Sequence, residues 1–225
     1  MSDKTGKETI AESLNKTLEK SKGIVFTVAA IIIVVIVAVA AFATVKSKSA
    51  EKGIEQIDLI SYNLTNEASD LSAEDVASRQ NKALEELAPL TSKGGVVGLR
   101  SNMLTAEIKF AQKNYEDARE AWLKAVEANA KAYTASLCYY NAAVCSEELN
   151  DSDSAISYYK SASEDTEFLL IDHAIFSLAR VNETAGKYED AKAAYDRLVE
   201  LHSSSSWAQL AKSRLIALRA AGKIQ

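Results

Sequence analysis

The distribution of hydrophobic and polar residues divides the chain sharply near its beginning. Residues 23–45 carry no charged side chain and are bounded by Lys22 and Lys46. A helix rises about 1.5 Å per residue, so this run matches the roughly 30 Å thickness of the hydrocarbon core of a bilayer. A helix in the core of a soluble protein would keep a polar stripe, and this run has none. The pattern predicts a transmembrane helix over residues 23–46.

The polar residues 1–22 are expected to form a solvated tail. A weak apolar spacing through Ile10, Leu14 and Leu18 leaves a short amphipathic helix as the alternative. Five lysines lie before the span and three lie shortly after it. Because cytoplasmic flanks are enriched in Lys and Arg, this bias predicts a cytoplasmic tail and an extracytoplasmic domain. Small residues up to Ala43 leave cleavage as a signal peptide open, with a mature start at Thr44.

Beyond residue 46 the pattern is helical. The sequence has one proline and no alternating Val, Ile and Thr runs bounded by turn residues, so strands are not expected. Ala, Leu, Glu and Lys are abundant, and all of them favour helices. The sequence therefore predicts an all-α domain over residues 47–225 behind the span.

This domain repeats itself. Residues 113–126 (KNYEDAREAWLKAV) and 186–199 (GKYEDAKAAYDRLV) share six identities in register. A weaker copy at residues 152–163 lies between them, so the period is 36–37 residues. Each copy is preceded by another helical segment, and that segment carries a small residue at the same position in every unit. Each unit is therefore predicted to be a helix, a short turn and another helix.

The small residues predict how the two helices of a unit meet. Antiparallel helices approach closely where side chains are short, and an aromatic ring then fills the adjacent groove. The predicted contacts pair Ala106 with Ala118, Ala143 with Ala155, and Ala179 with Ala191, and the predicted fillers are Trp122, Tyr159 and Tyr195. The turn follows Asn114 or Gly186, which we expect to end the first helix.

This pattern resembles the tetratricopeptide repeat over about residues 98–203. The resemblance rests on the small-residue positions, the Tyr before the second helix, and the aromatic residue four positions beyond the first Ala of that helix. The units are longer than the usual 34 residues, and Ala130 stands where a proline usually closes the unit. An ungapped similarity between residues 83–106 and 194–217 predicts a degenerate first repeat at about 50–92, with its first helix at 50–64 and its second starting near Ala73 after Ser72. A final helix from Ser206 to about Ala221 is expected to close the stack.

The resemblance implies a concave surface lined by the first helix of each unit. Positions two, five, nine and twelve of that helix would face this groove. They are Arg100, Met103, Glu107, Phe110, Leu137, Tyr140, Val144, Glu147, His173, Phe176, Arg180 and Glu183. The apolar members are expected to form the floor, and Arg100 and Arg180 to bind carboxylates of a partner. The alternative, that these aromatic residues belong to the core between repeats, stays open. The Lys and Asn residues with which some such proteins clamp a chaperone's C-terminal carboxylate are absent from the matching positions.

Catalytic chemistry finds no support in the sequence. The two histidines, His173 and His202, have no carboxylate or thiol cluster at metal-ligand spacing, and the phosphate-binding and nucleophile motifs are absent. No enzyme activity, cofactor or metal is expected. Cys138 and Cys145 lie about 10 Å apart along one helix, too far for a disulfide, and are expected to be buried free thiols. Residues 46–225 hold 21 basic and 27 acidic residues, which argues against a nucleic-acid partner.

A single span followed by an acidic, divergent repeat domain resembles the ancillary subunits of the bacterial SecYEG translocon. This resemblance implies a non-enzymatic scaffold on the extracytoplasmic face of a bacterial inner membrane, anchored through residues 23–46. Its partners would be proteins or peptides, with translocon or periplasmic chaperone components as the most concrete version. Three alternatives stay open: a coordinator of envelope assembly or division that uses the same surface, a cytosol-facing receptor, which unpaired thiols favour, and self-association into a homo-oligomer.

Overall fold

The computed structural model describes residues 10–67 and 71–225, and throughout these residues the fold is all-α, as predicted. The helices are α1 (Ile10–Thr65), α2 (Ala73–Thr91), α3 (Gly95–Ala111), α4 (Tyr115–Ala128), α5 (Ala135–Glu148), α6 (Ser152–Ser163), α7 (Ile171–Thr184), α8 (Tyr188–Leu201) and α9 (Ser206–Ala220). The chain forms two compact units, Met1–Glu51 and Lys52–Gln225. Helix α1 contributes residues to both.

Within the described residues, α1 is the one helix that is long and apolar enough to cross a membrane. Its part from Phe26 to Thr65 contains a stretch with a mean hydropathy of 3.1, none of which is buried in the protein. A signal sequence near an N-terminus can also be long and apolar enough to meet this criterion, so both readings of residues 23–45 stay open. The predicted first helix of the degenerate repeat is the C-terminal part of α1, where Ile57 and Ile60 are buried.

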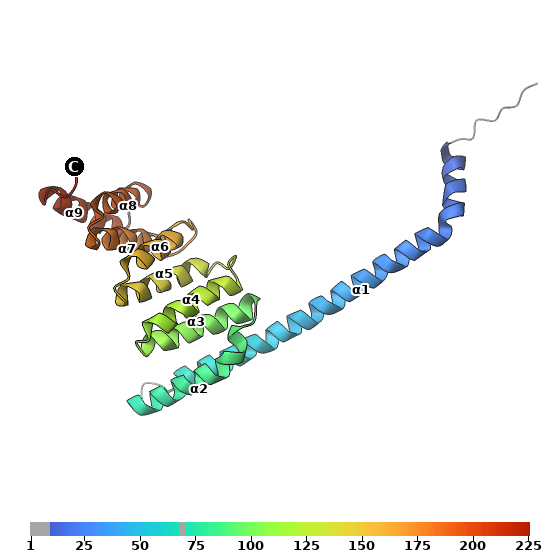
Figure 1. Cartoon of the computed structure of the whole chain (residues 1–225), viewed down its shortest axis with the longest axis horizontal. Coiled ribbons are helices and arrows are strands. Elements are labelled where there is room, and N and C mark those ends of the chain that lie inside the picture. The colour runs from blue at the N-terminus through green and yellow to red at the C-terminus, as the bar shows by residue number, and fades with distance from the viewer. Residues whose placement is uncertain (1–9, 68–70) are drawn as a thin grey trace, which may run out of the picture. The chain divides into compact units, whose positions relative to one another are not determined.

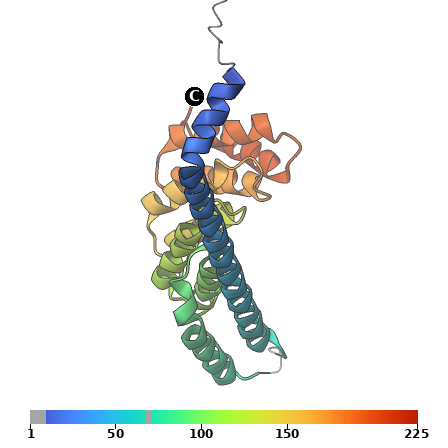
Figure 2. The ribbon, with the colours of Figure 1, turned by 90° about the vertical axis from the view of Figure 1, so that its right-hand side faces the viewer.

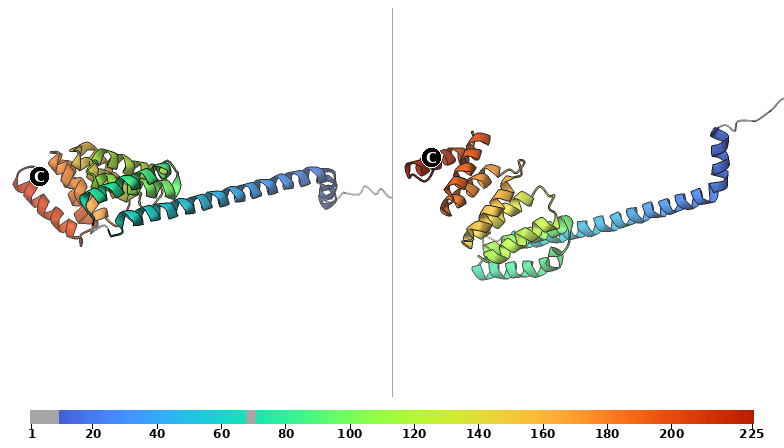
Figure 3. Two further views of the ribbon diagram at one scale, coloured as in Figure 1. Left: turned by 90° about the horizontal axis from the view of Figure 1, so that it is seen from below. Right: turned by 45° about the horizontal axis from the view of Figure 1, so that its top comes forward.

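Helices α2 to α9 form a series in which each packs against its neighbours in sequence (Figure 1). The pairs α3/α4, α5/α6 and α7/α8 can be followed from other sides in Figure 2 and Figure 3. Helix α7 also packs against α9. Because each helix pair contacts mainly the neighbouring pairs, the part of the chain from Lys52 to Gln225 is a solenoid, and its helices do not surround one central core.

The alanine contacts predicted from the repeat are confirmed. All six of these alanines, Ala106, Ala118, Ala143, Ala155, Ala179 and Ala191, are fully buried. The two members of each predicted pair lie in the same buried cluster. Short side chains at these points let the helices of a pair approach closely, so the spacing of small residues fixes where the helices touch.

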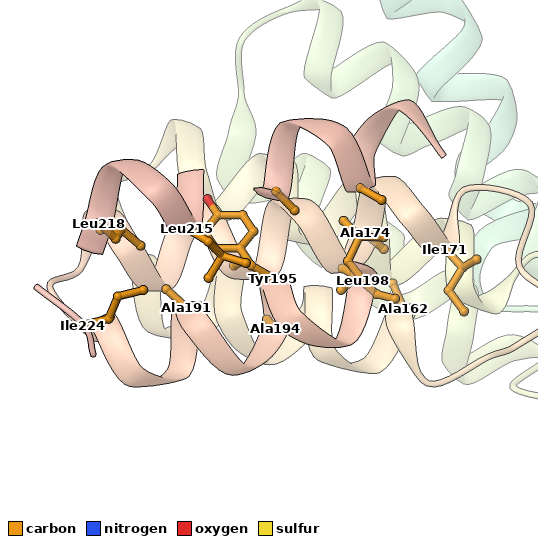
Figure 4. Packing of buried hydrophobic residues seen from close by; sticks show 14 of the residues in the cluster. Ala162, Ile171, Ala174, Ala191, Ala194, Tyr195, Leu198, Leu215, Leu218 and Ile224 are labelled. Carbon is orange, nitrogen blue, oxygen red and sulfur yellow. The ribbon is translucent and has the colours of Figure 1, made fainter. Parts of the chain in front are cut away.

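The predicted aromatic fillers are also confirmed. Trp122, Tyr159 and Tyr195 retain 4%, 1% and 0% of their exposure. Figure 4 shows Tyr195 of α8 beside Leu215 of α9, within the cluster that also contains Ala191 and Ala194. Burying an aromatic ring removes a large apolar area from water, so these rings dominate the packing of each unit.

The turn inside each unit differs from the expectation in one residue. The left-handed position is occupied by Lys113, Asn150 and Gly186, with φ of 61°, 57° and 75°. Gly186 ends its helix as predicted, but Asn114 does not, since it is the N-cap of α4 and accepts a bond from the Asp117 amide. The short Asn side chain can cap a helix N-terminus, and the preceding Lys113 takes the strained conformation instead.

This difference gives a test of turn energetics. Replacing Lys113 with Gly should stabilise the protein by about 1 kcal/mol, because Gly adopts a positive φ without a steric penalty. The matched Gly186→Ala variant should destabilise by about 1 kcal/mol for the same reason. A Cβ at Gly186 would meet no atom within 4 Å, so its effect is conformational. Urea unfolding of the detergent-solubilised chain, followed by circular dichroism, measures both, and equal signs for the two variants would contradict this account.

The start of the degenerate repeat also agrees with the sequence. Helix α2 begins at Ala73, and the Ser72 hydroxyl accepts a bond from the Asp75 amide at 3.1 Å. A group of glycines at residues 94, 95 and 98 surrounds the start of α3. Gly98 is buried inside α3, where a Cβ would lie 1.6 Å from the Lys93 carbonyl oxygen. It is required for close approach of the backbone.

Candidate protein-binding groove

The first helices of adjacent units line a hollow on the predicted groove side. Arg100, Met103 and Glu107 of α3 come together there with Leu104, and α1 contributes Ile57 and Ser61. The hollow has a volume of about 160 Å³. Three of the predicted groove residues therefore share one site. Sequence reasoning missed Ile57 and Ser61, because no tetratricopeptide-like motif marks the C-terminal turns of α1.

The charged groups of this hollow differ in how they are compensated. The Arg100 guanidinium lies 2.5 Å from the Asp58 carboxylate of α1, so it is paired within the protein. Glu107 keeps an exposed side chain, yet its neighbours shield the carboxyl from water and raise its pKa above the ordinary value. Glu107 has no cationic partner among the described residues, and a partly shielded carboxylate of this kind next to apolar surface favours a ligand with a cation beside an apolar group.

Phe110 and Val144, two further predicted groove residues, are not among the residues that line this hollow. Phe110 is 36% exposed and meets Tyr115 edge to face, with ring centroids 5.2 Å apart. Val144 is half-buried against the cluster of Ala143, Ala155 and Tyr159. Both side chains offer part of their apolar surface to solvent and part to the core.

The remaining predicted aromatic residues connect successive units. The Tyr140 hydroxyl hydrogen-bonds to His173 Nδ1 at 2.9 Å. His173 stacks on Trp207 of α9 at a centroid distance of 4.0 Å, and Phe176 packs against the same indole and against Tyr195. Burial, and then the nearby Arg180, lower the pKa of His173, which favours the neutral ring. Tyr140 and Phe176 are half-buried, so they serve the core between repeats and expose only part of their surface.

A Tyr–Glu–Arg arrangement recurs at two successive junctions. The Tyr159 hydroxyl donates to Glu147 at 2.6 Å, and Arg180 of the next unit binds both oxygens of that carboxylate at 2.7 Å. At the following junction Tyr195 donates to Glu183 at 3.0 Å, and Arg214 binds the same carboxylate. Arg180, predicted to bind a partner's carboxylate, therefore already binds one inside the protein.

The first junction replaces all three members of this arrangement together. Trp122, Phe110 and Val144 occupy the places of the Tyr, the Glu and the Arg in the repeat alignment. A Glu beside Trp122 would lack both its hydroxyl donor and its cation, and a poorly paired carboxylate is costly to desolvate. The joint replacement leaves three apolar side chains at the first junction in place of the Tyr–Glu–Arg arrangement.

The cysteines have no role in this surface. Cys138 and Cys145 of α5 are buried and free, as predicted. Burial raises the pKa of Cys138 to about 12 and that of Cys145 to about 11. Since the thiolate is the reactive form, both thiols are unreactive near neutral pH. Among the described residues, no group of three or more His, Cys, Asp or Glu could hold a metal ion.

Comparison with known proteins agrees with this geometry. Two family models described as "Tetratricopeptide repeat" match residues 137–164 and 173–205. A TPR repeat-containing protein of Treponema pallidum is 32% identical over 139 residues, which is 62% of this chain and 58% of that protein. Response regulator aspartate phosphatase J of Bacillus subtilis is 36% identical over 92 residues, which is 38% of this chain and 24% of the phosphatase. The chain thus matches well under two thirds of either relative.

Solved structures share the fold. BtubC (BKLC) from P. vanneervenii superposes with a TM-score of 0.53 at 14% identity, covering 80% of this chain and 87% of that protein. Identity this low supports the fold alone. Repeat families of this kind generally bind other proteins and are generally not enzymes. The repeat models and the helix-pair series together lead to one conclusion: residues 137–164 and 173–205 match tetratricopeptide repeats, and the helix pairs form an α-solenoid of the kind that binds other proteins.

Proposed function

We propose that the protein is a membrane-anchored, non-enzymatic scaffold that holds a polypeptide partner at the extracytoplasmic face of a bacterial inner membrane. The observation that carries the proposal is the combination of an apolar helix in α1 with a repeat solenoid in one chain. Tethering raises the local concentration of the solenoid near membrane machinery, so weak contacts suffice for binding. Translocation or chaperone components are the partners that fit this placement.

The lysine bias around the span supports the orientation. Lysines are more numerous before residue 23 than directly after residue 45. Since positively charged flanks stay in the cytoplasm, residues 47–225 face the other side. The free thiols Cys138 and Cys145 favour the opposite, cytosol-facing arrangement. Protease treatment of intact spheroplasts separates the two, because an extracytoplasmic solenoid is digested and a cytosolic one is protected.

The proposed contact site is the hollow lined by Ile57, Met103 and Glu107. An apolar partner side chain fills the hollow beside Met103, and a neighbouring Lys or Arg of the partner pairs with Glu107. Arg100 and Arg180 hold the groove walls through Asp58 and Glu147 and remain paired in the complex. Phe110, Tyr140, Val144 and Phe176 extend the apolar surface along the groove.

Photocrosslinking in native membranes tests this site. A photoreactive residue at Met103 should capture a discrete polypeptide, and Glu107→Lys in the same chain should reduce the yield at least about tenfold by opposing the partner's cation. The matched position is Ala193, which is exposed on α8 away from the hollow. Products at Met103 that are no different from those at Ala193 would refute the groove proposal.

Mass spectrometry of the crosslinked partner decides between roles. Translocase or chaperone components support the leading version, and septation or envelope-assembly proteins support the coordinator of envelope assembly. A deletion strain gives an independent answer, with secretion defects expected for the first role and envelope or division defects for the second.

A further inference from the structure

Helix α9 leaves a whole stripe of its surface uncovered. It buries Ala208, Ala211, Leu215 and Leu218 on one face. Lys212, Ile216 and Arg219 follow each other at spacings of four and three on another face, and all are exposed, Ile216 by 66%. Since residues at this spacing share one side of a helix, they form a continuous stripe with an apolar centre and a cation at each end.

Helix α7 shows what normally covers such a stripe. It buries two faces, because Val181 lies in a cluster with Tyr159 of α6 while Ala179 lies in a cluster with Tyr195 of α8. Helix α9 packs in this way against α8 and, through Trp207, against α7. Among the described residues, no helix covers its second face.

The charge of this region is opposite to that of the rest of the solenoid. Residues 201–225 contain no Asp or Glu, although the solenoid as a whole is acidic, and they carry Lys212, Arg214, Arg219 and Lys223. Arg214 binds Glu183, and the Lys223 ammonium lies 5.0 Å from the centre of the Tyr188 ring. Lys212 and Arg219 bind no acidic group in the part of the chain that the structure describes.

The opposite end of the series carries the complementary charge. Helix α2, far from α9 in Figure 1, contains Glu74, Asp75, Glu85 and Glu86. Arg79 is bound to the carbonyl oxygens of Asn63 and Asn66, and Lys82 lies 3.9 Å from Glu86. Glu74 and Glu85 have no cationic partner among the described residues. The exposed side of α2 between them is hollowed where Ala77, Ser78 and Asn81 present short side chains, and Lys82, which is paired with Glu86, also lines this hollow.

We propose that the solenoid associates head to tail, with the Lys212–Ile216–Arg219 stripe of one copy docked on the exposed side of α2 of a second copy. Ile216 enters the hollow at Ala77 and Ser78, and the two cations meet Glu74 and Glu85. Lys212 and Arg219 lie about 10 Å apart along their helix, and Glu74 and Glu85 about 17 Å, a difference that the long basic side chains bridge.

The geometry of this contact sets the form of the assembly. The two surfaces are different patches at opposite ends of one molecule, so the contact is heterologous and generates open chains or closed rings. The contact leaves the groove beside Met103 free, so this inference goes beyond the proposed function and can fail independently of it. Its strength depends on ionic strength, because both cations and both carboxylates are exposed to solvent.

Sedimentation velocity of the detergent-solubilised full chain tests the proposal. The mean mass of the wild type should rise with protein concentration and fall when NaCl is raised from about 0.05 M to about 0.5 M. Lys212→Glu with Arg219→Glu should weaken association at least about tenfold, and Glu74→Lys with Glu85→Lys should do the same. The matched control is Lys131→Glu with Lys160→Glu, which changes net charge equally at exposed sites and should leave association unchanged.

Mixing the two charge-reversed variants is the decisive arm. In each variant alone, the α9 stripe and the α2 surface carry charges of the same sign and repel each other. In the mixture, the α9 stripe of each variant can meet an α2 surface of opposite charge on the other variant, so association should return. No association of the wild type, or a mixture that stays monomeric, overturns the proposal. Loss of binding to phosphatidylglycerol vesicles in the α9 variant, with unchanged self-association, would overturn it and assign the stripe to an anionic membrane surface. Circular dichroism of each variant verifies that it is folded.

Discussion

Replacing Tyr195 with Ala should lower the free energy of unfolding by about 3–5 kcal/mol, the range for truncating a buried aromatic ring. Tyr195 is fully buried in the cluster that joins α7, α8 and α9. Its ring contacts Phe176, and its hydroxyl donates to Glu183. Removing the ring leaves a cavity that the neighbouring helices can fill only in part. Urea unfolding of the detergent-solubilised chain measures the loss.

Tyr195→Phe separates the ring from its hydroxyl. This variant keeps the packing and loses one hydrogen bond to a carboxylate, so it should cost only about 1–2 kcal/mol. Arg214 still neutralises Glu183 in this variant, because its ion pair does not involve the ring. A Tyr195→Phe loss as large as that of Tyr195→Ala would contradict the view that ring burial dominates the junction.

The second large effect is expected at the alanine contacts. Ala179→Leu should destabilise by about 1–3 kcal/mol, because extra methylene groups in a well-packed contact force side chains off their rotamers or move the backbone. Ala179 is fully buried and shares its cluster with Ala191 of the facing helix. The helices of this pair must separate to admit a longer side chain.

Ala193→Leu is the matched control for this prediction. Ala193 lies on α8 of the same pair but is exposed. The same substitution there should change stability by less than about 0.5 kcal/mol, as for most surface positions. Equal losses at Ala179 and Ala193 in the same unfolding measurement would show that the alanine contact does not control helix spacing.

Several features of the structure were predictable because they depend on local patterns. The repeat of small residues fixed the contacts of Ala118, Ala155 and Ala191, since each needs only a helix pair of known spacing. The cap at Ser72 followed from one hydroxyl and the amides directly after it. The sequence did not show that Lys113, and not Asn114, adopts the left-handed conformation. Either residue could end the first helix, and Asn114 instead caps the N-terminus of α4 through its side chain.

The candidate groove was predictable in part. Register placed Arg100, Met103 and Glu107 on one side of α3, and they do line one hollow. The sequence could not show that Arg100 is paired with Asp58, or that Arg180 is paired with Glu147, because the partners lie 42 and 33 residues away. Such pairings depend on how one unit stacks on the next, which no local spacing contains.

The helical class, the repeating unit, the buried alanines with their aromatic fillers and the apolar run at residues 23–45 could all be predicted from the amino-acid pattern. These features follow from periodicity and side-chain size, which act over a few turns of helix. The pairing of Arg100 and Arg180 within the protein, and the lack of a counter-charge for Glu107 and the α9 stripe among the described residues, became visible only from the packing of the helices. Whether a charged side chain has a partner of opposite charge depends on the residues that the neighbouring repeat places beside it. The stacking of the repeats brings these residues together.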